Sequence, residues 1–452
     1  MVELEQRQSE DLPAGGLRLR TLGHASLVVY RAGERPLLLT DPWLLGSVYW
    51  RSWWLQHCPS REDIAWLGQA AHVYITHEHP DHFHTPSLRR LGGGPLYLLP
   101  DLAERGWGRY LGEHGYRVKV APPLRWLSLG DGVSMLSIPL WNDDSLLLVD
   151  TPNALILNLN DAKPPPPIVR ALRRLGDRIG KPRVLLCSYS PASLVNSFLD
   201  DRGIVSLRSR QDYVAYACRL CDRLAIDYYM PFASQAVFRR EDSRWANAYR
   251  TTYDDLQRYW RAPARLLPPY ATLDLGGFRF TAVSPEHYRS PDCRRVARRV
   301  EEREIEERAT VLTAADLDLL QRKLNRFGRL IRILLPRGFA FRFGAQSLFY
   351  DPRRRALADC PGRARGDFVV EAPPATVRDA LRHNHLSDLG ITMFVRIRVL
   401  RPIDLRKAYG LFVLFQFDDY GHLAGLRPFL RWLGRGLRYS LVLRLPQPPR
   451  AR

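Results

Sequence analysis

The sequence predicts an α/β protein in which two β-sheets are sandwiched between layers of helices, followed by a smaller α+β domain. Three observations favour this fold class. Short apolar and β-branched strand segments alternate with helical patterns from residue 17 to residue 283. Four consecutive prolines at residues 164–167 divide that stretch into halves with a similar alternation. A charge-mixed helical pattern at residues 291–307 then separates it from the rest of the chain.

The length of 452 residues exceeds what one ordinary hydrophobic core needs, so we expect more than one domain. The predicted division is a large domain over residues 17–290, a helical connector over residues 291–335 and a small α+β domain with a basic tail over residues 336–452. No apolar run reaches the length that spans a bilayer, and the first residues are acidic and polar, unlike a signal peptide. We therefore expect a cytoplasmic protein without a transmembrane segment.

The segment from residue 17 to residue 40 contains three short β-rich stretches separated by turn residues, which predicts an antiparallel meander. The loop that follows, residues 49–54, is rich in aromatic side chains and is called the aromatic loop below. Long aromatic loops beside a metal site often wall a substrate pocket, and burial in the core is an equally good interpretation. The candidate substrate-pocket residues are His24, Trp53, Trp54 and Tyr189.

The densest group of metal-binding side chains follows a short predicted strand at residues 73–76. His77, His79, Asp81 and His82 lie within six positions, in a segment called the metal loop below. The first two are two residues apart on an extended loop, so their imidazoles can face one side. The other two follow a turn and can serve a second ion nearby. A solvated histidine-rich loop is disfavoured, because loop residues seldom cluster by ligand type without a function.

Asp161 comes directly after a predicted hairpin of strands at residues 145–150 and 154–159. A carboxylate just past a buried strand lies where a loop leaves the sheet, which is the same kind of position as the metal loop. Asp161 is therefore a candidate ligand shared by two ions. Capping of a helix that begins near the prolines at residues 164–167 explains this aspartate equally well.

The second half of the chain repeats the alternation, after prolines that predict an exposed connection. Helices are predicted at residues 169–175, 211–224 and 242–260, and strands at residues 184–189 and 227–231. Beyond the connector, helices are predicted at residues 314–335 and 374–383, and strands at residues 339–350, 367–371 and 390–400. In the last of these strands apolar residues alternate with Arg396 and Arg398, which is the pattern of a half-buried strand.

The formal net charge of +20 does not by itself indicate nucleic-acid binding, because only five of the 67 basic residues are lysine and the arginines are spread along the chain. The sequence shows no dedicated nucleic-acid module. The tail after Asp419 carries seven arginines and no acidic residue. A basic amphipathic helix there could touch a membrane surface or an anionic partner. A helix that packs its apolar face on its own domain is the favoured interpretation.

Several stretches, taken in series, resemble one known superfamily. They are Leu22-Gly-His-Ala-Ser, Leu39-Thr-Asp-Pro-Trp-Leu-Leu-Gly, Trp53-Trp54, Tyr74-Ile-Thr-His-Glu-His-Pro-Asp-His, Asp144-Ser-Leu-Leu-Leu-Val, Ile156-Leu-Asn-Leu-Asn-Asp, Met230-Pro-Phe-Ala and Ala271-Thr-Leu-Asp-Leu. The chain thereby resembles the metallo-β-lactamase fold superfamily, and most closely the catalytic region of the CMP-N-acetylneuraminate hydroxylases. The resemblance implies an αββα sandwich as the catalytic domain and two divalent metal ions. The ligands it implies are His77, His79, Asp144 and Asp161 for one ion and Asp81, His82 and Asp161 for the other.

Two positions depart from the superfamily pattern. The third histidine at the first ion is missing, and the resemblance implies that Asp144, or its neighbour Asp143, completes that site with a carboxylate. A turn or a helix cap is the alternative role for these aspartates. The late histidine at the second ion is also missing, and His24, His287 or water could take its place.

Replacing imidazole by carboxylate makes a harder, more anionic site of the kind that holds iron, whereas nitrogen-rich sites suit zinc. Iron is therefore the favoured metal, with zinc or manganese possible. The related hydroxylases are iron-dependent monooxygenases, so the resemblance also implies oxygen chemistry. Those relatives carry a Rieske centre held by Cys-x-His and Cys-x-x-His pairs, which this sequence does not contain. A monooxygenase would therefore need an external electron donor.

The favoured hypothesis is a dinuclear iron monooxygenase that hydroxylates a small or carrier-bound metabolite. The first alternative is a zinc- or manganese-dependent hydrolase of a phosphoester, amide or lactone, in which a bridging hydroxide attacks and the metals polarise the substrate. A non-catalytic scaffold is a second alternative, which the intact metal loop disfavours. Nucleic-acid processing is a third, and the diffuse arginine excess argues against it.

Overall fold

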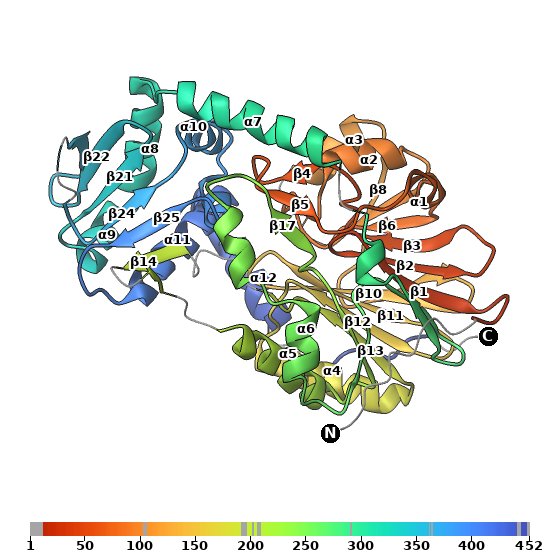
Figure 1. Ribbon diagram of the computed structural model, residues 1–452. Coiled ribbons are helices and arrows are strands. Elements are labelled where there is room, and N and C mark those ends of the chain that lie inside the picture. Colours follow the sequence, from red (N-terminus) through yellow and green to blue (C-terminus); the bar gives the residue numbers. More distant parts are fainter. Residues whose placement is uncertain are drawn as a thin grey trace.

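The computed structural model describes residues 12–102, 106–190, 197–200, 203–205, 209–289, 292–360, 362, 365–440 and 444–449. Two large sheets face each other, and helices cover the outer face of each (Figure 1). The long helix α7 (Cys293–Ala309) leads from them to a third sheet. Among the residues described, no helix combines the length and the apolar character that crossing a bilayer requires.

The first sheet has the strand order β20-β19-β1-β2-β3-β6-β7-β8. Its strands are β1 (Leu17–Leu22), β2 (Ser26–Arg31), β3 (Pro36–Thr40), β6 (His72–Tyr74), β7 (Leu96–Leu99), β8 (Arg117–Val120), β19 (Ala271–Asp274) and β20 (Phe280–Ala282). β1, β2 and β3 form the predicted antiparallel meander, whereas β3, β6, β7 and β8 run parallel. The outer face is covered by α1 (Arg61–Leu67), α2 (Thr85–Leu91) and α3 (Trp107–Glu113). Because β3 and β6 are parallel neighbours, their carboxyl ends meet, and the metal loop begins there.

The second sheet has the order β18-β16-β13-β12-β11-β10-β9. Its strands are β9 (Trp126–Gly130), β10 (Val133–Pro139), β11 (Ser145–Asp150), β12 (Leu155–Asn160), β13 (Arg183–Cys187), β16 (Tyr228–Pro231) and β18 (Arg265–Leu266). The helices α4 (Pro166–Ile179), α5 (Arg210–Leu224) and α6 (Tyr253–Tyr259) cover its outer face. The predicted hairpin before Asp161 is β11 and β12, which pair antiparallel.

Side chains alternate between two apolar cores along the central strands. In β11, Leu147 and Val149 lie in the core between the two sheets, and Leu146 and Leu148 lie in the core beneath α4 and α5. Every residue of β11 is buried, which is why its sequence is a continuous apolar run and not an alternating one. The four layers confirm the predicted αββα fold class.

The third sheet has the order β15-β14-β25-β24-β21-β22-β23. Its strands are β14 (Phe198–Asp200), β15 (Gly203–Ile204), β21 (Phe339–Phe343), β22 (Gln346–Asp351), β23 (Ala356–Asp359), β24 (Phe368–Glu371) and β25 (Arg396–Val399). The helices α8 (Ala314–Arg326), α9 (Gly328–Leu334), α10 (Pro374–Arg382) and α11 (Leu405–Asp419) accompany it. β14 comes from the middle of the chain and pairs parallel with β25. The domain boundaries at residues 290 and 335 stay predictions.

Several local predictions were wrong in whole or in part. The helix expected at residues 314–335 is two helices, α8 and α9, and the strand expected at residues 339–350 is the hairpin of β21 and β22. The strand expected at residues 390–400 is only β25, because Met393 has a φ of 65° and its neighbours are buried on both sides of the chain. The helix expected at residues 242–260 is interrupted, and α6 begins anew at a capping box on Thr252. The connection at the four prolines is exposed only in part, because Pro164 is buried, and Pro166, which is exposed, already begins α4.

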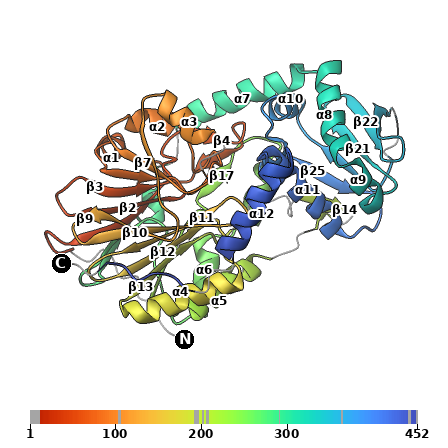
Figure 2. The same ribbon diagram turned by 180° about the vertical axis from the view of Figure 1, so that it is seen from behind.

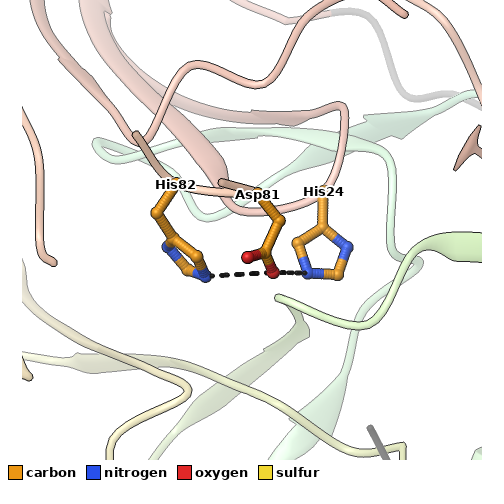
Figure 3. A group of neighbouring side chains, drawn as sticks. All are labelled: His24, Asp81 and His82. Atoms are coloured by element: carbon orange, nitrogen blue, oxygen red, sulfur yellow. Dashed lines mark ion pairs between the residues drawn. The ribbon is translucent and has the colours of Figure 1, made fainter. Parts of the chain in front are cut away.

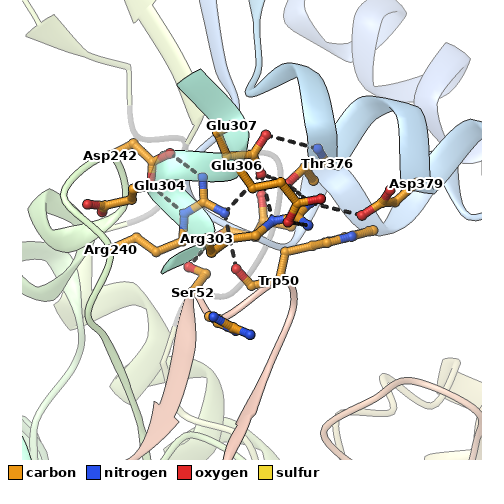
Figure 4. Close-up of polar contacts among 12 residues, drawn as sticks. Trp50, Ser52, Arg240, Asp242, Arg303, Glu304, Glu306, Glu307, Thr376 and Asp379 are labelled. Carbon is orange, nitrogen blue, oxygen red and sulfur yellow. Dashed lines mark hydrogen bonds and ion pairs between the residues drawn. The ribbon is translucent and has the colours of Figure 1, made fainter. Parts of the chain in front are cut away.

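A buried network of charges joins α7 and α10 to the aromatic loop (Figure 4). The Arg240 guanidinium is fully buried; it donates to the Trp50 carbonyl at 3.1 Å and lies 3.5 Å from the Glu307 carboxylate. Arg303 donates to Glu307 at 2.9 Å and to Asp379 at 2.9 Å. Each buried charge therefore has an opposite charge beside it, and removing one partner would leave the other unpaired.

After α11 the chain returns to the first part of the molecule as α12 (Leu426–Ser440), which lies on the outside between the second and third sheets (Figure 2). On the inner side of α12, Trp432 Nε1 donates to the Trp141 carbonyl at 2.8 Å and Tyr439 Oη donates to Asp101 Oδ2 at 2.9 Å. The turn between α11 and α12 is thereby held against the metal loop.

Candidate metal centre

The metal loop is anchored by the buried carboxylate of Asp41, at the end of β3. Asp41 accepts hydrogen bonds from the Thr76 backbone N–H at 2.7 Å and from the Thr76 hydroxyl at 2.8 Å. Its Oδ2 also lies 3.1 Å from Nδ1 of His82. A carboxylate on Nδ1 fixes the imidazole so that Nε2 is the nitrogen available to a metal.

Nε2 of His82 faces one group of possible ligands formed with His24 and Asp81 (Figure 3). Asp81 Oδ2 lies 3.6 Å from His82 Nε2 and 3.3 Å from His24 Nε2. One ligand atom from each residue lies within 4.8 Å of the others, and all three side chains are buried. These distances are short enough for one cation to be bound by the three groups together.

A second group of possible ligands consists of His77, His82 and Asp161. The rings of the two histidines have their centroids 4.0 Å apart, and Asp161 Oδ2 lies 3.5 Å from His82 Nε2. Asp161 is the most exposed member, with a side chain 35% exposed, so solvent reaches the cluster at this group. His82 belongs to both groups, and the two candidate sites are therefore adjacent.

His79 and Asp144 each contact His77 without joining either group. His77 Nε2 lies 2.9 Å from His79 Nδ1, and His77 Nδ1 lies 3.5 Å from Asp144 Oδ1. Asp144 is buried and also accepts from the Ser145 backbone N–H at 2.7 Å. All six predicted ligands thus lie in one contiguous cluster, and the structure adds His24 to it.

The unsatisfied atoms in this cluster fit a divalent cation. Among the residues described, Nδ1 of His24 is buried without a hydrogen-bond partner, and Nε2 of His24 and Nε2 of His82 lie beside Asp81 without a well-directed hydrogen bond. A buried polar atom left unpaired costs about 1–3 kcal/mol, and a metal ion would accept the lone pair of such a nitrogen. Imidazole and carboxylate donors in roughly equal number are suited to iron, manganese or zinc.

The charges of the cluster shift several pKa values. Burial would raise the pKa of Asp81, but the nearby His82 and His24 outweigh it and hold that pKa well below its usual range. Burial would lower the pKa of His82, but Asp41 and Asp81 outweigh it and raise that pKa well above its usual range. Burial, with the charge of Asp161 added to it, raises the pKa of Asp144 well above its usual range. A divalent cation would relieve this crowding of carboxylates.

The backbone around the cluster adopts left-handed conformations at several non-glycine residues. The φ angles are 41° at Asp41, 65° at Asp143, 38° at Asn160 and 50° at Tyr49. Aspartate and asparagine adopt this conformation readily, so the strain of order 1–3 kcal/mol falls on Tyr49. Strain of this kind is concentrated where the surrounding structure holds ligands in place.

Two side chains of the aromatic loop, Tyr49 and Trp53, contact residues of the cluster. Trp53 lies 5.9 Å from the His24 ring and 4.9 Å from the Tyr49 ring, measured between centroids. Tyr49 Oη donates to Asp81 Oδ1 at 2.7 Å. Trp53 itself is buried, so it supports ligands and does not line an open pocket.

Two predicted pocket residues pack elsewhere. Trp54 follows Trp53 on β5 (Trp53–Leu55), so its side chain points the opposite way, into an apolar cluster with Val296 and Val300 of α7. Tyr189 is buried in the core beneath α4 and α5. The structure does not bring these two side chains to the metal loop.

Residues near the carboxyl end of the chain were missed by the sequence analysis. Tyr420 Oη lies 2.8 Å from His79 Nε2, and His422 forms a close ion pair with Asp143. Both residues lie in the turn between α11 and α12. The sequence signal that could have identified them is a histidine and a tyrosine in a turn of an otherwise arginine-rich tail.

A cavity of about 550 Å³, called the arginine cavity below, opens beside the metal loop. Its lining includes three arginines and three histidines against two carboxylates. The arginines are Arg109, Arg431 and Arg435, the histidines are His383, His385 and His422, and the carboxylates are Glu78 and Asp419. Tyr420 and Glu78 border both this cavity and the metal loop, so a molecule bound here would lie next to the candidate ligands.

Curated sequences similar to this chain share one name. A protein from Danio rerio called cytidine monophosphate-N-acetylneuraminic acid hydroxylase is 33% identical over 177 residues, which cover 36% of this chain and 28% of the relative. The Pan troglodytes protein of that name is 26% identical over 300 residues, 61% of this chain and 48% of the relative. This chain is similar to the CMP-N-acetylneuraminic acid hydroxylases. The resemblance predicted from the motifs is confirmed.

The similarity to the hydroxylases is partial. An inactive Homo sapiens hydroxylase is 26% identical over 300 residues, which are 57% of its length. The chain thus matches about a quarter to a little over half of the length of these relatives. No family model matches the chain.

Solved structures similar to the chain include a hydroxylase and hydrolases. A mutant of the CmlA beta-hydroxylase is 20% identical with a TM-score of 0.41, and the match covers 59% of this chain and 55% of the other. An isothiocyanate hydrolase from Delia radicum gut bacteria is 14% identical with a TM-score of 0.40, over 57% of this chain and 98% of the other.

Proposed function

We propose that the chain is a dinuclear metal-dependent monooxygenase that hydroxylates a small anionic or carrier-bound metabolite, with iron as the favoured metal. The observation that carries the proposal is the buried Asp144 carboxylate beside His77, where related folds have a third histidine. Such a carboxylate-rich site suits iron and oxygen chemistry better than an all-imidazole site does. The sequence similarity to hydroxylases supports the same choice.

The proposed ligands are those that the sequence analysis named, with His24 added. His77, His79, Asp144 and Asp161 would hold one ion, and His24, Asp81, His82 and Asp161 the other. His24 is preferred to His287 for the open position because His24 is buried beside Asp81, whereas the side chain of His287 is 76% exposed. When bound, the metal pair would supply the redox chemistry that inserts one atom of O2 into a C–H bond and reduces the other to water, with two electrons from an external donor and two protons.

The residues around the ligands have their own proposed roles. Asp41 holds His82 by Nδ1 and keeps Nε2 directed at the site. Burial, with the nearby charge of Asp81 added to it, raises the pKa of Tyr49 well above its usual range, so its hydroxyl stays protonated and orients Asp81 by hydrogen bonding. Trp53 and the other buried aromatic side chains exclude water from His24.

The arginine cavity is the proposed substrate site. Its three arginines can hold carboxylate or phosphate groups by paired hydrogen bonds. The relatives are named for a nucleotide-linked sugar acid, which is an anion. A substrate held by these arginines would reach the metal loop past Tyr420 and Glu78.

A zinc- or manganese-dependent hydrolase of a phosphoester, amide or lactone is the second candidate function. The inclusion of His24 favours it, because this histidine raises the share of nitrogen donors and nitrogen-rich sites suit zinc. In that case the arginines would hold the phosphate or carboxylate of the substrate.

Metal analysis and oxygen consumption distinguish the two candidates. The purified chain is expected to contain about two iron ions and, with a chemical reductant, to consume oxygen faster than a His77→Ala, His82→Ala variant does. Addition of candidate anionic metabolites should yield a product that carries label from 18O2. A protein that contains only zinc and turns over a phosphoester, amide or lactone without oxygen would establish the hydrolase instead.

A further inference from the structure

Helix α12 presents a row of leucines to solvent. Leu426, Leu430, Leu433 and Leu437 are 72%, 53%, 38% and 53% exposed. Their spacing of four, three and four residues keeps them on one narrow face of an α-helix. The sequence analysis favoured an apolar face packed on its own domain, but these leucines, called the leucine row below, remain exposed.

The position of α12 on the protein is fixed by a different face. Trp432 and Tyr439 donate to Trp141 and Asp101, and these contacts hold the inner side of the helix. The leucine row therefore stays outside while the helix is firmly attached, as Figure 2 shows for the helix as a whole. A contiguous row of leucines exposed to solvent usually marks an interaction site.

Charge complementarity indicates which partner the leucine row fits. At 100° per residue, the exposed Arg427, Arg431 and Arg438 lie along one edge of the row, and α12 contains no acidic residue. On the other edge Trp141, which is 41% exposed, lies beside Gly436. Leucines between a basic edge and a tryptophan form the pattern of a helix that lies in the interface of an anionic membrane.

The shape of the surface favours a bilayer over a peptide. The arginine cavity is lined from α12 by Pro428, Arg431, Trp432 and Arg435, and the four leucines are not part of that lining. The row is a ridge about 16 Å long from Leu426 to Leu437, with side chains that project outward. A projecting ridge can enter the acyl-chain boundary of a bilayer, whereas a helical peptide needs a groove.

We propose that α12 docks on an anionic phospholipid surface, with the leucine row among the acyl chains and the flanking arginines at the level of the phosphates. The docking does not depend on any metal in the cluster. Since the same helix forms one wall of the arginine cavity, docking would bring that cavity to the membrane surface.

Sedimentation of the 452-residue chain with lipid vesicles tests this proposal. The chain is expected to sediment with phosphatidylcholine vesicles that contain phosphatidylserine and much less with pure phosphatidylcholine, and added salt should weaken binding. A Leu430→Ser, Leu433→Ser variant and an Arg427→Ser, Arg438→Ser variant should each bind about tenfold more weakly. Ile333→Ser, which changes an apolar residue 72% exposed on α9, is the matched control and should bind like the parent chain.

Circular dichroism of each variant shows whether it is folded, and all four arginine and leucine positions are exposed enough for that to be expected. Equal sedimentation of the parent chain and both double variants would overturn the proposal. So would a parent chain that does not bind phosphatidylserine vesicles but dimerises in solution, with the leucine variant monomeric, because the row would then be an interface between two copies.

Discussion

Tyr420 Oη lies 2.8 Å from His79 Nε2, although the two residues are 341 positions apart in the chain. The contact places the turn after α11 directly on the metal loop. A hydrogen bond from outside to a candidate ligand fixes the orientation of its ring. The last part of the chain is therefore built into the candidate metal centre.

Removing the Tyr420 hydroxyl should weaken metal binding. Tyr420→Phe is expected to lower the metal affinity about tenfold, because His79 loses the partner that orients it. Competition with a fluorescent chelator measures this affinity. Tyr409→Phe changes a tyrosine that is 41% exposed on the preceding helix, α11, and should leave the affinity unchanged. Equal affinities for both variants would show that the contact does not position His79.

His24 and His287 can be compared directly as the missing ligand. His24→Ala is expected to reduce the bound metal from about two ions to about one per chain, because the group with Asp81 and His82 loses a nitrogen donor. His287→Ala removes an exposed imidazole and should leave the metal content unchanged. Elemental analysis after dialysis decides between them, and two ions retained in the His24 variant would exclude it as a ligand.

A glycine before His24 should be intolerant of a side chain. Gly23 has a φ of 58°, and a Cβ there would lie 2.6 Å from the Trp43 carbonyl oxygen. Gly23→Ala is therefore expected to lower the free energy of unfolding by about 1–3 kcal/mol and to displace His24. Gly33 has a φ of 82° with open space around its Cβ position, so Gly33→Ala should cost only about 1 kcal/mol.

Urea denaturation of the two glycine variants separates the cost of the left-handed backbone conformation from the cost of the clash with the Trp43 carbonyl. Both substitutions place alanine in a left-handed conformation, and only the one at residue 23 adds a clash with backbone. If the two variants unfold at the same urea concentration, the close approach to Trp43 is unimportant for stability.

The buried Asp388 should make stability depend on pH. Burial, with the charges of Asp419, Glu78 and Asp81 added to it, raises the pKa of Asp388 well above its usual range. An aspartate whose folded pKa is raised costs nothing below its unfolded pKa, near 4, and destabilises increasingly as pH rises from there to the folded pKa. Asp388→Asn mimics the neutral acid and is expected to raise the Tm at pH 7 but not at acid pH. A Tm that falls equally at both pH values would contradict this.

The sequence allowed the fold and the centre of the site to be predicted for local reasons. The metal loop directly follows β6, and Asp161 directly follows β12 at the same end of the two facing sheets, so two short stretches of sequence already imply the cluster. The buried β11 was recognisable as a continuous apolar run. Fold class and resemblance to the hydroxylases followed from these short patterns.

The contacts that could not be predicted are those between distant parts of the chain. Tyr420 contacts the metal loop and His422 contacts Asp143 only because the third sheet and α11 lead the chain back to the first two sheets, and no local periodicity encodes that path. The roles of Trp53 and Trp54 differ because they lie on opposite faces of a three-residue strand. A pattern of aromatic residues alone does not say which of them faces the site.

The pairing of β14 with β25 constrains how this protein can be divided. A fragment that begins at residue 291 would lack β14 and would expose the backbone of β25 along one edge. Such a fragment, expressed alone, would be prone to self-association through the exposed edge of β25. Exchanging this region between homologous proteins would require β14 to be exchanged together with it.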